Sequence, residues 1–300
     1  MVSLLGRYTN GNYMVAVYDD GTKVRYGRSD EFVPEKPESM DLKITNQCDM
    51  GCPMCHENST DYGAHGDILN LPFLDTLNPY TEIAIGGGNP LSHPDLDDFL
   101  VGLKRRNLIA NMTVNQKHFM DNLERLSALC DKKLIYGLGV SLTDTPHSDF
   151  IEAFTKFPTA VLHVINGMVS PMTLIRLKDR GFKVLMLGYK KFRRGGDYYA
   201  AHDESVKRTM QVTYDMLPNM VNWFDVMSFD NLAIKQLNVR RLMSEDEWKT
   251  FYMGDDGTFT MYVDAVNREF AASSVSTRRH DITSDIADMF AVVKEERNEP

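Results

Sequence analysis

Three cysteines within eight residues carry the clearest chemical signal in this 300-residue chain. They form the pattern Cys48-x-x-x-Cys52-x-x-Cys55, while the fourth cysteine, Cys130, stands far away. A disulfide framework spreads its pairs to close long loops, so this crowding favours metal binding instead. Thiolates are the usual ligands of iron–sulfur clusters. Three thiolates on one short loop can hold three irons and leave the fourth iron open for an exogenous ligand.

A zinc site is the main alternative for these three thiols. Zn²⁺ normally takes four ligands, and His56 or His65 could complete a Cys₃His set. Zinc motifs more often combine one Cys-x-x-Cys pair with a second, distant pair, and the chain supplies no second pair. Cys130 lies at helical spacing from neighbouring leucines. This predicts that it is buried as a small hydrophobic residue and does not bind metal.

The elements that must position the cysteines begin at Ser39, where short apolar strands start to alternate with segments of helical period. This alternation is typical of βαβ units around a parallel sheet, and we identify six such units. The cysteines directly follow the first strand, at the edge where parallel α/β sheets present their functional loops. The predicted strands are Met40 to Thr45, Glu82 to Ile85, Ala110 to Val114, Ile135 to Ser141, Ala160 to Ile165 and Lys183 to Leu187. The clearest predicted helices are Leu96 to Arg106, Met120 to Asp131, Ser148 to Phe157, Pro171 to Arg180 and Glu204 to Leu217.

Short β-hairpins flank this core on both sides. Near the N-terminus, two β-rich runs are joined by a turn at Asp19-Asp20-Gly21, and a proline-containing linker follows. A second hairpin is predicted around Asn267, after a further strand at Trp223 to Phe229, and a helix at Ile282 to Lys294 ends the chain. We therefore expect an N-terminal hairpin and linker at 1–38, a core at 39–217, and a C-terminal extension at 218–300 that completes or caps the core.

The cysteine pattern in this position resembles that of the radical S-adenosylmethionine (SAM) superfamily. The resemblance spans roughly Met40 to Leu217 and implies a partial (β/α)₆ barrel of the TIM type, within the α/β class. It further implies that Cys48, Cys52 and Cys55 bind a [4Fe-4S] cluster whose fourth iron is chelated by SAM. Met54 stands where the family usually has an aromatic residue, and its bulky apolar side chain preserves packing there.

The activity implied by this resemblance is reductive cleavage of SAM at the cluster. The product, a 5′-deoxyadenosyl radical, abstracts hydrogen from a substrate that the sequence does not identify: a small molecule, a nucleotide or a peptide. A low-potential electron donor such as flavodoxin or ferredoxin is the expected partner. Two alternatives remain open, namely a glycyl-radical-type activase acting on a partner protein and a non-catalytic zinc or iron–sulfur binding module.

Further family motifs point to residues that would bind SAM. Gly86-Gly87-Gly88-Asn89-Pro90 follows the second strand and resembles the Gly-Gly-Glu-Pro motif that binds the SAM amino group. Asn89 replaces the acidic residue of that motif and keeps a carbonyl acceptor. The remaining candidates lie at later strand ends: Asn115 and Ser141 for the ribose and carboxylate, and Ile165 for the adenine. Alternatively, the two polar residues cap the helices that follow them, and Ile165 lies in the core.

Two loops are candidates for the substrate side. Tyr189 to Tyr199 is basic and aromatic, with the cations of Lys190 to Arg194 at its centre. It is able to bind a carboxylate or phosphate, or it is simply a solvated surface loop. The loop His56 to Asp67 after the cysteines is unusually polar for its length, and its groups either contact substrate or wrap the cluster.

Composition limits the remaining function classes. The hydrophobic fraction of 43% supplies a sizeable core, and the formal net charge of -9 works against non-specific binding to nucleic acid or to anionic membranes. No apolar run approaches the roughly 20 residues that span a bilayer. The apolar stretch at the N-terminus is interrupted by polar residues too early to be a signal peptide. We therefore expect a cytoplasmic protein.

Overall fold

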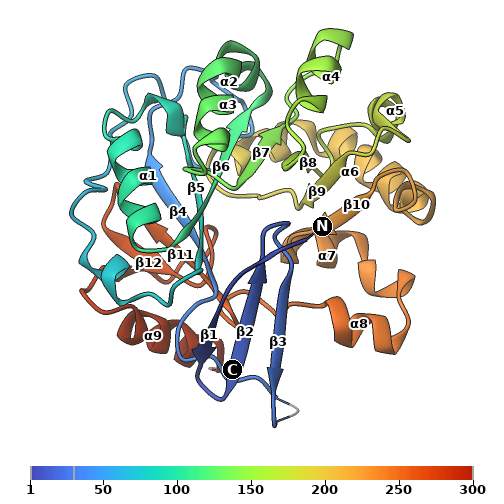
Figure 1. The fold of residues 1–300 in the computed structure, drawn as a ribbon. Coiled ribbons are helices and arrows are strands. Elements are labelled where there is room, and N and C mark those ends of the chain that lie inside the picture. Colours follow the sequence, from blue (N-terminus) through green and yellow to red (C-terminus); the bar gives the residue numbers. More distant parts are fainter. Residues whose placement is uncertain (1, 30, 299–300) are drawn as a thin grey trace.

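A ten-stranded, mostly parallel sheet forms the centre of the molecule (Figure 1). The computed structural model describes residues 2–29 and 31–298. The strand order is β10-β9-β8-β7-β6-β5-β4-β11-β12-β13, and β4 to β11 run parallel. Their bounds are β4 (Ser39–Thr45), β5 (Glu82–Gly87), β6 (Ile109–Asn115), β7 (Gly137–Ser141), β8 (Ala160–Ile165), β9 (Lys183–Leu187), β10 (Val226–Phe229) and β11 (Thr260–Asp264).

The six predicted strands are all present, and so is the predicted alternation with helices. The helices are α1 (Leu96–Arg105), α2 (Gln116–Asp121), α3 (Leu123–Asp131), α4 (Ser148–Thr155), α5 (Pro171–Leu174) and α6 (Arg194–Met220). Figure 1 shows them around the outside of the curved sheet. The segment expected as one helix from Met120 to Asp131 is two helices, because Asn122 leaves helical geometry with φ at -132°.

The side chains of the central strand β4 show which face of the sheet packs against the helices. On β4, the side chains of Met40, Leu42 and Ile44 belong to the main hydrophobic core, which also contains the apolar faces of the helices. The alternate residues of a strand point to the opposite face. Asp41 and Lys43 therefore lie on the interior face of the curved sheet. Polar side chains on this interior face are available to a site at the carboxyl ends of the strands.

A small antiparallel sheet packs at the amino ends of these strands. It consists of β1 (Leu4–Asn10), β2 (Tyr13–Tyr18) and β3 (Lys23–Gly27), and it lies below the main sheet in Figure 1. The predicted hairpin is β2–β3, and β1 is an additional strand. Lys23 of β3 pairs with Glu82, the first residue of β5, at 2.9 Å. This sheet is therefore held at the end of the core opposite to the cysteines.

The chain after residue 217 continues the same sheet. β10 follows β9 at one edge, and β11 inserts beside β4, where it forms the predicted hairpin with β12 (Glu269–Ala271). The short β13 (His280–Asp281) pairs with β12, and α9 (Ile286–Asn298) packs its apolar side chains into the main core. Helices α7 (Asn231–Leu237) and α8 (Glu245–Phe251) lie between β10 and β11 in sequence. Within the described residues, no helix is both long enough and apolar enough to cross a membrane.

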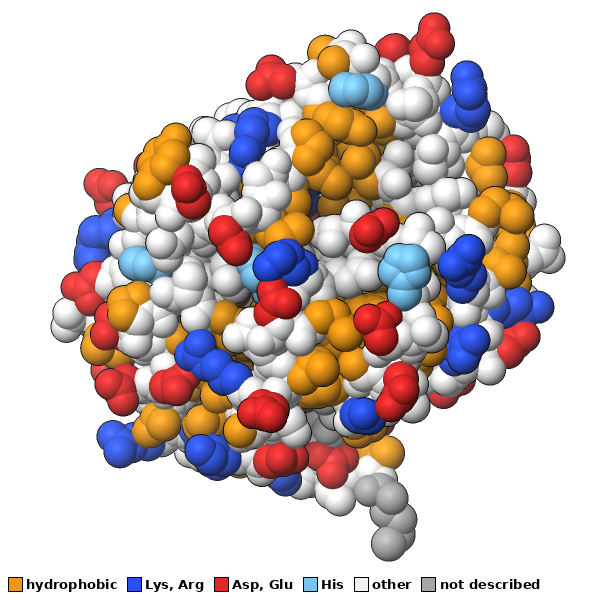
Figure 2. Space-filling model, turned by 90° about the horizontal axis from the view of Figure 1, so that it is seen from above, with side chains coloured by type: hydrophobic (Ala, Val, Ile, Leu, Met, Phe, Trp, Pro, Cys, Tyr) orange, Lys and Arg blue, Asp and Glu red, His pale blue; other side chains and the backbone are white. Residues whose placement is uncertain are grey.

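Charges of both signs are mixed on the surface that Figure 2 presents. Lys and Arg side chains alternate there with Asp and Glu, and exposed hydrophobic side chains lie between them. This face therefore carries no broad field of one sign, although the chain as a whole has a formal net charge of -9.

Candidate metal and SAM site

The three clustered cysteines line one cavity of about 190 Å³ at the carboxyl ends of the strands. They lie on the loop that follows β4, residues 46–66, here called the cysteine loop. The ends of β5, β6, β7 and β8 complete the wall, so residues distant in sequence meet here because parallel strands end at a common edge. The lining residues are Cys48, Cys52, Met54, Cys55, His56, Ser59, Gly86, Gly87, Gly88, Thr113, Val114, Asn115, Ser141, Leu142, Thr143 and Ile165.

All but one of the residues predicted from sequence lie in this cavity. The exception is Asn89, which lines a neighbouring hollow together with Cys48. Its side-chain oxygen accepts a hydrogen bond from the Leu91 backbone N–H at 3.2 Å and so caps the following turn. Asn115 behaves similarly, because its oxygen accepts from the His118 N–H at 2.9 Å. Both asparagine oxygens therefore have a local structural partner.

The glycine turn after β5 packs directly against the start of the cysteine loop. The Gly88 N–H donates to the Thr45 carbonyl at 2.7 Å, and the Asn89 N–H donates to the Gln47 carbonyl at 2.6 Å. A Cβ on Gly88 would lie 2.1 Å from the Gln47 carbonyl oxygen, and Gly87 has a φ of 115°. By contrast, a Cβ on Gly86 would have no atom within 4 Å. Gly87 and Gly88 are thus required by the fold, whereas Gly86 borders open cavity.

This contrast predicts different results for two alanine substitutions. We expect Gly88→Ala to lower the thermal unfolding midpoint, because the backbone of the cysteine loop must shift to admit a methyl group. We expect Gly86→Ala to keep the wild-type midpoint but to weaken SAM binding about tenfold, since its methyl group occupies ligand space. Calorimetric unfolding and SAM titration of both variants measure the two effects. Equal SAM affinity in Gly86→Ala and wild type would contradict a role for this turn in SAM binding.

The thiols themselves are partly buried. Burial raises the pKa of Cys52, and the neighbouring cysteines raise it further; burial likewise raises the pKa of Cys48. Without a metal these two groups are therefore protonated at neutral pH, and metal binding must release their protons. A donor set of three thiols on one cavity fits an iron–sulfur cluster that keeps one iron free of protein ligands.

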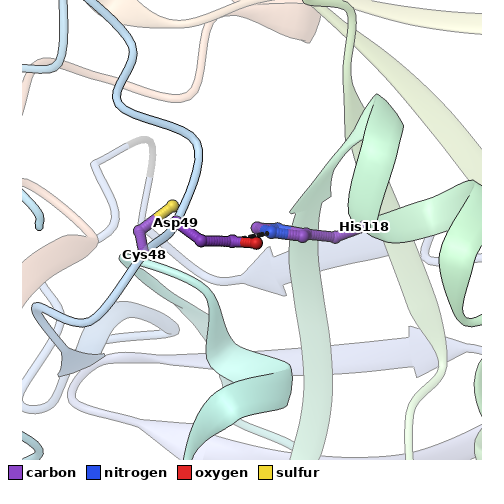
Figure 3. A group of neighbouring side chains, drawn as sticks. All are labelled: Cys48, Asp49 and His118. Atoms are coloured by element: carbon purple, nitrogen blue, oxygen red, sulfur yellow. Dashed lines mark hydrogen bonds and ion pairs between the residues drawn. The ribbon is translucent and has the colours of Figure 1, made fainter. Parts of the chain in front are cut away.

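One histidine near the cysteines escaped the sequence analysis. His118, on α2, places its Nε2 at 2.5 Å from a carboxylate oxygen of Asp49 (Figure 3). Its Nδ1 lies 3.0 Å from the Asn115 amide nitrogen. Ligand atoms of Cys48, Asp49 and His118 lie within 4.8 Å of one another. Both ring nitrogens of His118 already have partners, so the imidazole supports the cysteine loop through Asp49. The Asn115-x-x-His118 spacing at a helix start was the available signal.

The two histidines considered as zinc ligands lie in different surroundings. The His65 Nδ1 is bonded to the Thr45 hydroxyl at 2.8 Å, and its ring packs against His93. His56 does line the cavity, but its Nε2 contacts the Glu57 carboxylate at 3.2 Å and the Lys190 ammonium at 3.3 Å. Burial together with Lys190 lowers the pKa of His56. His65 is absent from the lining of the cysteine cavity, and in His56 the Nε2 atom is already engaged.

A buried ion-pair network ties the cysteine loop to the strand β4 that precedes it. The Lys43 ammonium lies 3.0 Å from the carboxylates of both Glu57 and Asp264, and the Lys43 side chain is only 1% exposed. Burial alone would raise the pKa of Glu57, but the hydrogen bond from His56 and the charge of Lys43 outweigh it and hold the pKa well below its usual range. Three elements, β4, the cysteine loop and β11, are thereby tied together.

The basic loop after β9 also contacts the cysteine loop, through the backbone of Glu57 and Ser59. Arg193 donates to the Glu57 carbonyl at 3.0 Å, and Arg194 donates to the Ser59 carbonyl at 2.5 Å. Lys190 donates to the Ser274 hydroxyl at 2.8 Å. These cations, considered from sequence as an anion site, therefore bind the protein's own loops and hold the polar segment after the cysteines in place.

Comparison with solved structures places this architecture among known folds. No protein-family model matches the chain, and no curated protein matches it by sequence. Streptococcus suis SuiB bound to precursor peptide SuiA matches with a TM-score of 0.59 at 13% identity, over 89% of this chain and 68% of SuiB. SuiB bound to S-adenosylmethionine gives 0.57 at 12%, over 89% and 69%. anSMEcpe with bound AdoMet gives 0.51 at 15%, over 87% and 80%. The partial barrel expected from sequence is confirmed.

Proposed function

We propose that this chain, which has the fold of the radical SAM enzymes SuiB and anSMEcpe, is itself a radical SAM enzyme. One observation carries the proposal: the three cysteines and all of the residues expected to bind SAM except Asn89 line a single cavity. When bound there, a [4Fe-4S] cluster supplies the electron that splits SAM into methionine and a 5′-deoxyadenosyl radical, which abstracts hydrogen from substrate.

Different residues of the cavity would bind the cluster and the separate parts of SAM. Cys48, Cys52 and Cys55 provide the thiolates. The open space beside Gly86 admits the amino-acid end of SAM close to the backbone, where no Cβ intervenes. Ser141 supplies a hydroxyl at the end of β7, and Ile165 an apolar surface at the end of β8, for the adenosine part.

The substrate class favoured by this proposal is a peptide. SuiB has been solved with its precursor peptide, and this chain covers most of the SuiB fold. An electron donor such as flavodoxin or ferredoxin and a cytoplasmic location complete the proposal. A glycyl-radical-type activase would need a docking surface for its partner protein. The two hairpins are not separate appendages that would serve this purpose, because β1–β3 packs on the core and β11–β12 belongs to the main sheet.

Anaerobic purification followed by a cleavage assay tests this function. We expect brown protein with about four irons and four sulfides per chain. After dithionite reduction it should convert SAM to 5′-deoxyadenosine, detected by liquid chromatography. Colourless protein containing one zinc per chain and inactive toward SAM would overturn the proposal in favour of a zinc module. Brown protein that never cleaves SAM would indicate a closed, non-catalytic cluster.

A further inference from the structure

An acidic side chain faces the interior of the sheet one step below the candidate SAM site. Asp41 lies on β4, which is paired on one side with β5 and on the other with β11. Its neighbours Met40 and Leu42 are buried on the helix side, yet the Asp41 side chain is exposed. An exposed residue in the middle of a sheet means that the interior face is open at this point.

The Asp41 carboxylate has no partner among the described residues: it accepts no hydrogen bond and forms no ion pair there. Two cations on this side of the sheet are engaged elsewhere. Lys43 pairs with Glu57 and Asp264, and Lys190 is held by Ser274 and His56. His163 faces the same interior from β8, but burial lowers its pKa to about 4, so it is neutral at pH 7.

The surroundings of Asp41 disfavour its negative charge. The Asp41 side chain opens onto the interior space, but protein surrounds that space, and this desolvation raises the pKa of the Asp41 carboxyl; Lys190 opposes the increase, whereas Asp256 and Asp230 add to it. A carboxylate that is accessible from the interior space and has no partner is available to bind a cation, and unpaired titratable groups of this kind gather at functional sites. The missing partner is therefore a positively charged group that the chain does not supply.

We propose that Asp41 binds a cationic group of the substrate, a primary amine or a guanidinium, on the interior face of the sheet. Lys43 pairs with Gly86 across β4 and β5, so Asp41 lies about 7 Å along the strand from the level of Gly86. A lysine or arginine side chain is long enough to cover such a distance while the substrate backbone stays near the SAM pocket. That the ligand is the substrate rests on the proposed function, but the cation site itself does not.

Binding of small cationic amides to the SAM-loaded full-length protein tests this site. The probes are N-acetyl-lysine amide and N-acetyl-arginine amide, with N-acetyl-norleucine amide and N-acetyl-citrulline amide as neutral counterparts. We expect at least one cationic amide to bind ten or more times tighter than its neutral counterpart, measured by ligand-observed NMR. Because this readout requires no SAM cleavage, its failure is distinguishable from failure of the radical SAM assignment.

The isosteric variant Asp41→Asn separates recognition from structure. We expect it to abolish the preference for the cationic amide and to leave the thermal unfolding midpoint unchanged or raised, since an unpartnered carboxylate contributes no native contact. The matched control Glu204→Gln removes an exposed carboxylate on the outer helix α6 and should preserve the preference. Absence of any preference in wild type, its persistence in Asp41→Asn, or a lowered midpoint in that variant would each overturn the proposal.

Discussion

Replacing Cys52 with alanine should abolish both the cluster and SAM cleavage. A cluster of this type needs all three protein thiolates, because the fourth iron is left for SAM. Cys52 lies in the middle of the cysteine loop and lines the same cavity as Cys48 and Cys55. We expect iron to fall from about four per chain to near zero after gel filtration. The yield of 5′-deoxyadenosine should fall to that of a protein-free sample.

Cys130→Ala is the matched control for this experiment. Cys130 lies in the last turn of helix α3, packed against the hydrophobic core, and lines no part of the cavity at the cysteine loop. Iron content and SAM cleavage should therefore stay at wild-type levels in this variant. Persistent cleavage by Cys52→Ala, with iron retained, would refute the ligand role assigned to this residue.

The sequence predicts the site well wherever position along a strand decides it. Cysteines after β4, glycines after β5 and Ser141 at the end of β7 must meet, because parallel strands end at one edge. This rule needs no knowledge of side-chain contacts, and the cavity confirms its geometric consequence. The rule says nothing about side-chain orientation. It therefore could not show that the oxygens of Asn89 and Asn115 are occupied as caps.

Contacts between distant segments were beyond the reach of the sequence. Lys43 and Asp264 are 221 positions apart and meet only because β11 inserts beside β4. The strand β1 was missed because Gly6 and Arg7 interrupt its apolar pattern. The glycine is required there, since a Cβ on Gly6 would lie 2.1 Å from the ring of Tyr80. Both features depend on tertiary packing, which overrides local propensity.

The interior ion pairs explain how the irregular cysteine loop is held in one position. A loop rich in polar residues gains little from hydrophobic burial, so its place must be fixed by specific contacts. Glu57 is the common partner: Lys43 binds its carboxylate from β4, and Arg193 binds its carbonyl from the loop after β9. The basic loop considered from sequence as substrate-binding thus contacts and supports the cysteine loop.

Lys43→Met should be the most destabilising change in this support. Methionine keeps the volume but removes the ammonium, which leaves the buried carboxylates of Glu57 and Asp264 without their shared partner. Breaking a buried pair in this way costs about 3–5 kcal/mol. We expect a thermal midpoint lower by roughly 10 °C in the metal-free protein, together with poor iron retention after reconstitution, because Glu57 closely follows Cys55.

Two further variants test whether the loss of charge causes the lower thermal midpoint of Lys43→Met. The triple variant Lys43→Met, Glu57→Gln, Asp264→Asn removes the two carboxylates together with the Lys43 ammonium. It leaves only the partly exposed Arg193 without its carboxylate partner, so it should recover part of the lost midpoint even though it contains more substitutions. Lys156→Met breaks the exposed pair between Lys156 and Glu152 on the outer surface and should leave the midpoint unchanged. If Lys43→Met unfolds at the wild-type temperature and retains its iron, the Lys43 ion pairs do not hold the cysteine loop, and its position comes from its other contacts, among them the glycine turn, the arginines and the Asp49–His118 pair.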